Sequence, residues 1–166
     1  AFFAGRQVHA TGQRGRKWYS PFGGVWISAA IPYSSDMKSP ELLGLSLAVS
    51  LSRRLESYSI PVRIKWPNDL IVNDRKLVGF LPKLISRGHS IRYLRFGIGL
   101  NVYNKLPIEA ISIRDIVRLS SSGLDLWSAE VLFALEDSLE LLSFPEVILE
   151  EACNRLWTKN VSLGND

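Results

Sequence analysis

The sequence predicts an α+β fold built on a mixed or antiparallel sheet. Strand-like segments come first, one amphipathic helix is embedded among them, and helical patterns dominate after Pro107. Strands that are grouped apart from most of the helices are typical of the α+β class. The 166 residues are enough for one domain with a sizeable core and too few for two ordinary domains.

The first part of the chain predicts two strands, a loop and a helix. Residues 2–8 and 25–31 have strand character, and 25–31 is apolar on both faces, which indicates a central strand. The polar, basic stretch 9–18 between them predicts a loop. Ser39 is expected to cap a helix with Pro40 at its first position. This helix should cover one face of the sheet with leucines that recur every four residues, namely Leu43, Leu47, Leu51 and Leu55.

The stretch 62–79 predicts a compact run of three short strands. Apolar and basic residues alternate over 62–66, Pro67 forces a corner, and 70–72 is again β-prone. A polar hairpin loop at 73–75 then leads into the third strand. This group suits a phosphate-bearing ligand with a divalent metal, and the alternative is a hairpin whose charges only face water. The side chains that the hairpin brings together are Lys65, Asn68, Asp69 and Lys76.

Two longer strands are predicted at 77–85 and 91–102, with a short loop between them. In the second strand Arg95 and Gly97 share one face, because successive side chains alternate. Gly97 and Gly99 are glycines inside a strand, which often mark the close approach of a ligand. The alternative for both is a β-bulge or tight packing of the sheet.

After Pro107 the pattern becomes helical. Residues 111–119 predict a strand end and a short helix, and Ser128 is expected to cap a longer helix. Pro145 should open a last helix whose apolar stripe includes 156–157. Cys153 lies on that helix and favours buried packing over a nucleophile, because no histidine lies near it in sequence.

Composition and charge narrow the function classes. Hydrophobic residues make up 46% of the chain, and no apolar run reaches the roughly 20 residues of a membrane-spanning helix. One cysteine excludes an internal disulfide framework, and with two histidines it argues against a structural zinc site. The net charge of +4 suits an anionic ligand or an acidic partner protein. A nucleic-acid module is the least favoured class, because the aromatic residues are not interleaved with the basic ones.

Three separated motifs together resemble those of the biotin protein ligases. Lys-Trp-Pro-Asn-Asp at 65–69, followed by Lys-Leu-Val-Gly at 76–79, is similar to the central signature of that family. The glycine-containing, basic stretch 7–24 resembles its ligand loop, and 97–102 resembles its third motif. The resemblance runs from about Phe3 to Trp157, with the motifs in the order of the family.

This resemblance implies a fold and a reaction. The fold would be a mixed, largely antiparallel sheet of about seven strands with helices mainly on one face. Lipoate ligases share this fold, which is related to the class II aminoacyl-tRNA synthetases. Biotin and ATP would give biotinyl-5′-adenylate with the help of Mg²⁺, and a lysine of biotin carboxyl carrier protein would then attack the mixed anhydride. The resemblance also implies a homodimer formed through the sheet. A cytoplasmic location is expected, and the single cysteine fits such a reducing compartment.

The resemblance assigns roles to residues that match the motifs. Lys76 is expected to bridge the biotin carboxylate and the α-phosphate, and Asp69 to help hold Mg²⁺. Trp18 offers an aromatic face for adenine and Asn101 an amide for its edge. The catalytic residues implied are Lys76, Arg16 and Asp69. The biotin-binding residues implied are Gln7, Thr11, Gly12, Gln13, Lys76 and Gly79, and the ATP-binding residues are Arg14, Arg16, Trp18, Lys65, Asn68, Asp69 and Asn101.

The chain departs from the family in its loop. The family usually carries two arginines where this chain has Thr11 and Gln13. Glutamine cannot offer a charged fork to phosphate, and one lost charged hydrogen bond corresponds to roughly ten- to a hundred-fold in affinity. We therefore hypothesise a ligase that retains its adenylate weakly, unless the neighbouring Arg14 substitutes. A second departure is Lys83, preceded by Pro82, where the family often has glutamate.

The motifs predict a biotin/lipoate ligase catalytic domain at 1–160, from which an N-terminal strand and helix of the family are absent. Residues 161–166 are expected to begin a small C-terminal β-domain. No segment resembles a DNA-binding domain, so the sequence offers no basis for a repressor role. Two other interpretations stay open. One is a lipoate or octanoate ligase of the same fold, and the other is a non-catalytic relative that binds biotin or a partner protein without chemistry.

Overall fold

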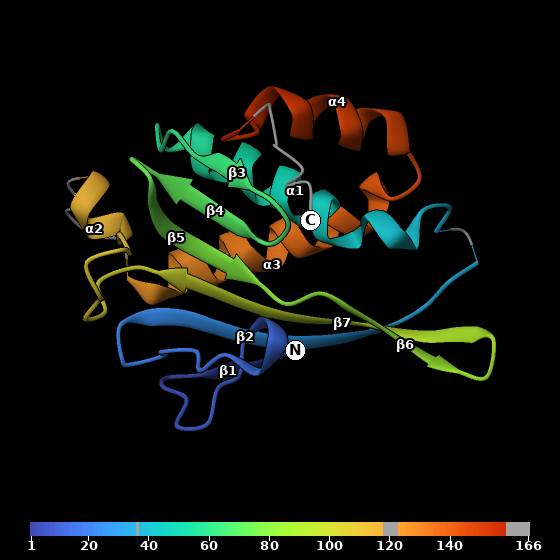
Figure 1. The fold of residues 1–166 in the computed structure, drawn as a ribbon, viewed down its shortest axis with the longest axis horizontal. Coiled ribbons are helices and arrows are strands. Elements are labelled where there is room, and N and C mark those ends of the chain that lie inside the picture. The colour runs from blue at the N-terminus through green and yellow to red at the C-terminus, as the bar shows by residue number, and fades with distance from the viewer. Residues whose placement is uncertain (36, 118–122, 159–166) are drawn as a thin grey trace, which may run out of the picture.

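The computed structural model describes residues 1–35, 37–117 and 123–158, and it has the predicted α+β architecture. A seven-stranded sheet carries its helices on one side, so that α1 and α3 lie behind the sheet in the view of Figure 1. The predictions for 161–166 and for the last residues of 111–119 lie outside the described residues. The helices are α1 (Leu43–Ser57), α2 (Ile113–Ile116), α3 (Leu124–Leu141) and α4 (Pro145–Arg155), with the 3-10 turns η1 (Gln13–Gly15) and η2 (Pro40–Leu42).

The strand order in the sheet is β1-β2-β7-β5-β4-β3, with β6 beside β7. Every pairing between these strands is antiparallel, and two isolated bridges, Ile64 with Leu156 and Lys76 with Ala110, are parallel. The prediction of a largely antiparallel sheet is therefore confirmed. The strands are β1 (Phe2–Ala4), β2 (Gly24–Pro32), β3 (Arg63–Lys65), β4 (Asp69–Val72), β5 (Arg75–Phe80), β6 (Lys83–Arg87) and β7 (Ser90–Asn101).

The strands β2 and β7 form the middle of the sheet, in register from Gly24 opposite Asn101 to Pro32 opposite Tyr93. Trp26 and Ile27 are both buried although they point to opposite faces, as a central strand requires. Along β7 the even-numbered residues from 94 to 100 are buried in the core, so their odd-numbered neighbours face the other side of the sheet. The helices cover the first face, and the second face is left for the loop that follows β1.

The helix α1 packs its leucine stripe into the core as predicted, since Leu43, Leu47, Leu51 and Leu55 are all buried. The predicted cap is correct in position, since Ser39 is the N-cap residue of a 3-10 turn with Pro40 as its first residue, but not in its hydrogen bond. The turn η2 lies between Ser39 and the first residue of α1, and Ser39 makes no side-chain capping bond. Pro40 therefore opens a 3-10 turn that leads into the helix.

Two predicted strands are shorter than expected. Of 2–8 only β1 is a strand, and beyond it Gln7 makes a single bridge to Ser20. The predicted strand 77–85 is interrupted between β5 and β6, where Pro82 has no N–H to give to the ladder. This break sends β6 out with the far end of β7 as a hairpin arm, which projects from the body in Figure 1.

The last helices correct three predictions. Ser128 lies inside α3, whose N-cap is Gly123, so it caps nothing. Cys153 is exposed, because α4 turns Ile148 and Ala152 toward the core and the residue after Ala152 points about 100° away. The helix ends at Arg155, so the pair 156–157 leaves the apolar stripe and runs beside β3.

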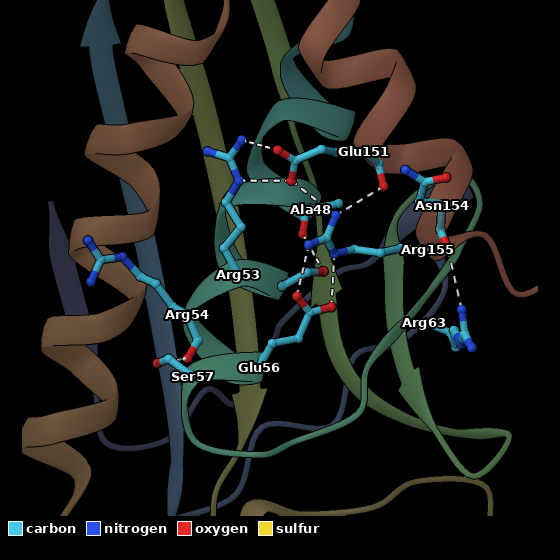
Figure 2. Close-up of polar contacts among 10 residues, drawn as sticks. Ala48, Arg53, Arg54, Glu56, Ser57, Arg63, Glu151, Asn154 and Arg155 are labelled. Carbon is cyan, nitrogen blue, oxygen red and sulfur yellow. Dashed lines mark hydrogen bonds and ion pairs between the residues drawn. The ribbon is translucent and has the colours of Figure 1, made fainter.

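Ion pairs join α4 to α1 (Figure 2). Glu151 binds Arg53 on α1 and also Arg155 one turn away on α4, at 3.0 Å. Arg155 reaches back to Glu56 on α1 at 2.8 Å. The result is a chain of alternating charges that secures α4 over α1.

None of the helices in the described part of the chain is long and apolar enough to cross a membrane.

Candidate active site

The face of the sheet opposite the helices holds a cavity of about 680 Å³, between the loop after β1 and the strands β5 and β7. The loop 7–18 forms one wall, and the glycine-bearing parts of β5 and β7 form the floor. Predicted site residues from three distant stretches of sequence meet here. Those that line the cavity are Gln7, Thr11, Gly12, Gln13, Arg16, Trp18, Asn68, Asp69, Lys76 and Gly79.

Two glycines lie in the floor of the cavity. Gly79 of β5 lies opposite Gly99 of β7, and the indole of Trp18 stands on both. A Cβ on Gly99 would lie 2.8 Å from the Trp18 ring and 3.0 Å from that of Trp26, and a Cβ on Gly79 would overlap Trp18. The group that approaches these strand glycines closely is therefore an aromatic side chain of the protein, and this side chain itself lines the cavity.

Lys76 and Asp69 meet at the edge of this floor. The Lys76 ammonium lies 2.6 Å from an Asp69 carboxylate oxygen and 4.5 Å from the centroid of the Trp18 ring. Both side chains are largely buried, with 29% and 21% of their surface exposed. Their neighbouring strands fix them, since Asp69 stands opposite Gly79 and the Lys76 N–H donates to the carbonyl of Glu109 at 2.9 Å. A positive charge is thus held ready beside a carboxylate and an aromatic face.

The corner before β4 is held by Asn68. Its side-chain amide donates to the carbonyl of Phe80 at 3.1 Å, and the Phe80 N–H donates to the carbonyl of Asn68 at 2.8 Å. The peptide bond between Trp66 and Pro67 is cis. These contacts set the tight corner that brings Asp69 back over β5.

The loop forms a short hairpin of its own across the cavity. Thr11 bridges Lys17, the Trp18 N–H donates to the carbonyl of Ala10 at 3.0 Å, and η1 forms the tip. At the base of the loop the hydroxyl of Ser20 donates to the side-chain oxygen of Gln7 at 3.0 Å. This bond leaves the Gln7 amide nitrogen as a donor for a ligand.

Three predicted site residues do not line the cavity. Arg14 lies exposed at the loop tip with a φ of 56°. The ammonium of Lys65 lies 5.0 Å from the ring centroid of Trp157. Asn101 is buried, and its amide donates to the Lys76 carbonyl at 3.2 Å while its oxygen accepts from Asn104. Asn101 therefore supports the backbone of Lys76 from below.

The cavity also contains residues that sequence reasoning did not assign to it, chiefly Lys17, Ser28, Leu81 and Arg95. For Arg95 a signal was present, because it shares its strand face with Gly97. No sequence signal placed Leu81 there, since its position depends on the break before β6.

Asp69 is the one acidic residue among the described residues that line the cavity, and its carboxylate suits a cation that arrives with a ligand. Among the described residues no group of three or more histidine, cysteine, aspartate or glutamate side chains is arranged to hold a metal. Mg²⁺ is commonly bound through one or two carboxylates together with substrate phosphates. Asp69 alone, beside a phosphate-bearing ligand, fits that donor set.

Known proteins that resemble this chain were found both by sequence and by fold. A family model described as "Biotin/lipoate A/B protein ligase family" matches residues 2–101. The "Bifunctional ligase/repressor BirA" of Escherichia coli (strain K12) is 31% identical over 150 residues, which cover 85% of this chain and 46% of that protein. The BirA protein of Salmonella typhimurium is also 31% identical, over 81% of this chain and 44% of its own length. The chain thus spans about half the length of these relatives.

A solved structure shares the fold. It is the biotin protein ligase from Aquifex aeolicus in complex with biotin and ATP, with a TM-score of 0.78 and 26% sequence identity. The match covers 93% of this chain and 67% of that one.

Proposed function

This chain belongs to the biotin/lipoate A/B protein ligase family, and on that premise we propose that it is the catalytic part of an ATP-dependent biotin ligase. Such an enzyme activates biotin as biotinyl-5′-adenylate and transfers it to a lysine of biotin carboxyl carrier protein. The observation that carries the proposal is the placing of Lys76 beside Asp69 and under Trp18 in the cavity. The related Aquifex aeolicus structure, which contains biotin and ATP, supports it.

The first step joins two anions. An oxygen of the biotin carboxylate forms a bond to the α-phosphorus of ATP while the bond to pyrophosphate breaks. In this proposal Lys76 lies between the two negative groups and lowers their repulsion in a site of low dielectric. Arg16 extends the positive charge along the phosphates. Mg²⁺, held by Asp69 and the phosphates, would neutralise further charge on the leaving pyrophosphate.

The second step needs protection from water. A neutral lysine amine of the carrier protein attacks the carbonyl of the mixed anhydride, AMP leaves, and an amide forms. Because water would hydrolyse the same anhydride, the loop over the cavity has to close on the adenylate. Gln7, Thr11, Gly12 and Gln13 line this side of the cavity and are proposed to hold biotin.

The nucleotide is proposed to lie on the side of Trp18. Its indole offers a face for adenine, and Asn68 lies at the corner beside Asp69. Lys65 and Arg14 are exposed, so each would reach phosphate by rotation of a long side chain. Asn101 contributes through its hydrogen bond to the backbone of Lys76. The biotin carrier partner, a cytoplasmic location and a homodimer belong to the same proposal.

The test is exchange of labelled pyrophosphate into ATP in the presence of biotin, lipoate or octanoate. We expect exchange with biotin, loss of it in Lys76→Ala, and no change in Lys105→Ala, which removes an exposed lysine outside the cavity. Exchange with lipoate or octanoate instead would move the protein to the lipoate branch. Binding of biotin without any exchange would indicate the non-catalytic relative.

A further inference from the structure

We propose that Arg95, assisted by Lys83, is a specificity-determining residue at the far end of the cavity, where it recognises a polar oxygen on the tail of the acid. The inference rests on the proposed function and says which acid the site prefers. It predicts that the ureido oxygen of biotin is favoured over the hydrocarbon tail of octanoate and the dithiolane ring of lipoate, neither of which carries an oxygen there.

The first argument is the position of Arg95. Along β7, Gly99, Gly97 and Arg95 lie on one face of the strand, and all three line the cavity. Arg95 lies four positions along the strand from Gly99, which is about 13 Å at roughly 3.3 Å per residue. Lys76 lies at the other end, because its Cε is 2.9 Å from where a Cβ on Gly79 would stand, and Gly79 is opposite Gly99. An acid whose carboxylate meets Lys76 therefore extends its tail along the floor toward Arg95.

The second argument is charge. Arg95 stands directly opposite Lys83 of β6, and like charges at directly opposed positions destabilise a sheet. On its other side Arg95 is opposite Ala30 of β2, which offers no acceptor. Within the described part of the chain neither cation takes part in an ion pair, and the sequence has no acidic residue from 81 to 108. A cation pair left unpartnered beside a cavity is a local cost that a ligand acceptor relieves.

The third argument is selectivity between tails. The ureido carbonyl of biotin accepts hydrogen bonds, and charged donors make the stronger ones. A hydrocarbon tail in the same place would cover the Arg95 donors and give them no acceptor, which disfavours it. Gly97 adds no side chain to this part of the floor, where a Cβ would lie 3.4 Å from the side chain of Leu81.

The experiment measures binding of the acids alone to the full chain by titration calorimetry, without ATP. The probes are biotin, lipoate, octanoate and octanedioate, which places a second carboxylate on the octanoate chain. The variants are Arg95→Leu, Arg95→Lys and Lys83→Leu. The matched control is Arg92→Leu, an exposed arginine of the same strand on the opposite face that does not line the cavity.

We expect wild type to prefer biotin. Arg95→Leu should weaken biotin binding by roughly tenfold or more and leave octanoate binding equal or tighter, because only the biotin complex loses a charged hydrogen bond. Arg95→Lys should lose less than Arg95→Leu, Lys83→Leu should shift the preference in the same direction, and Arg92→Leu should match wild type. Thermal unfolding of each variant identifies any loss of fold, and Arg95→Lys keeps the test valid if Arg95→Leu does not fold.

Several outcomes would overturn the inference. They are an equal effect of Arg95→Leu on biotin and octanoate, no effect on either, binding of octanedioate no tighter than that of octanoate, and no binding of any acid. Pyrophosphate exchange distinguishes a failure of this inference from a failure of the proposed function. Exchange that persists without an Arg95-dependent preference refutes only the inference, whereas a biotin preference without exchange refutes only the ligase activity.

Discussion

The proposed chemistry depends on the pair formed by Lys76 and Asp69. The carboxylate of this pair has two proposed roles. It holds the ammonium at 2.6 Å, and in the proposed reaction it also meets Mg²⁺. With Mg²⁺ bound, Asp69 would help to hold the metal, and the role of Lys76 would be to neutralise the reacting anions. Holding the metal would require Asp69 to be charged.

The variant Asp69→Asn is therefore expected to lower the rate of biotin-dependent pyrophosphate exchange by about 10²- to 10³-fold, the usual effect of removing one preorganised electrostatic group. It should also raise the Mg²⁺ concentration needed for half-maximal exchange. Steady-state exchange across a Mg²⁺ series measures both. Glu150→Gln, which changes an exposed carboxylate far from the cavity, is the control. An unchanged Mg²⁺ dependence in Asp69→Asn would remove Asp69 from the metal site.

Gln13, like Thr11, lines the cavity at a position where the resemblance leads us to expect an arginine. The variant Gln13→Arg restores a charged donor next to the proposed phosphate position. We expect release of biotinyl-adenylate to slow by roughly ten- to a hundred-fold, since a charged hydrogen bond is regained. The measurement is the rate at which pre-formed adenylate leaves the protein on dilution. Equal release from wild type and from Gln13→Arg would show that adenylate retention in this chain does not depend on residue 13.

At the scale of elements, α4 depends on its ion pairs as well as on its apolar face. Glu151 is bound by two arginines, one on α1 and one on α4 itself. The hydrogen bond from Arg53 is the main reason that the pKa of Glu151 lies below its ordinary value. A carboxyl group with a depressed folded-state pKa stabilises the fold above its unfolded-state pKa, and this contribution is lost as the pH falls through the folded-state value.

Glu151→Gln should therefore lower the free energy of unfolding by about 1 kcal/mol at neutral pH, within the range for partly exposed ion-pair networks. The difference from wild type should shrink as the pH falls through the lowered folded-state pKa of Glu151, because the wild-type carboxyl group then also becomes protonated. Denaturant unfolding at pH 7 and pH 3 measures it. The neighbouring exposed Glu150, changed to glutamine, should cost little at either pH. A Glu151→Gln deficit of equal size at both values would mean that packing, and not charge, holds α4.

The elements also show where the sequence was a sufficient guide. The leucine stripe of α1 and the alternation along β7 were predicted, because burial against a single core imposes these periods. The cap predicted at Ser128 was wrong, since many serines precede apolar runs and only the turn geometry decides which one ends up at a helix start. Cys153 shows the same limit, because one step around a helix separates a buried position from an exposed one.

In the molecule as a whole, a basic loop lies over the cavity, and the net charge of the chain is +4. The exposed cations of this loop, Arg14, Arg16 and Lys17, are sites for trypsin. If the loop closes on an anionic ligand, biotin with a non-hydrolysable ATP analogue should slow cleavage there by about tenfold or more. Mass spectrometry of the fragments follows these sites, with cleavage after Lys105 as an internal control. Equal protection of Lys105 would indicate general stabilisation, and no protection would mean that the loop does not close.

The sequence by itself determined the fold class, the leucine-bearing helix and the motifs that identify the family, because each rests on residue order and local period. Only the tertiary structure decided which of the motif residues share one cavity. Trp18, Lys76 and Gly99 meet because β5 and β7 pair in one register and the loop folds back across them. The same long-range pairing turned Asn101 into a support for Lys76 and brought Arg95 to the cavity, since register between distant strands is set by the core as a whole.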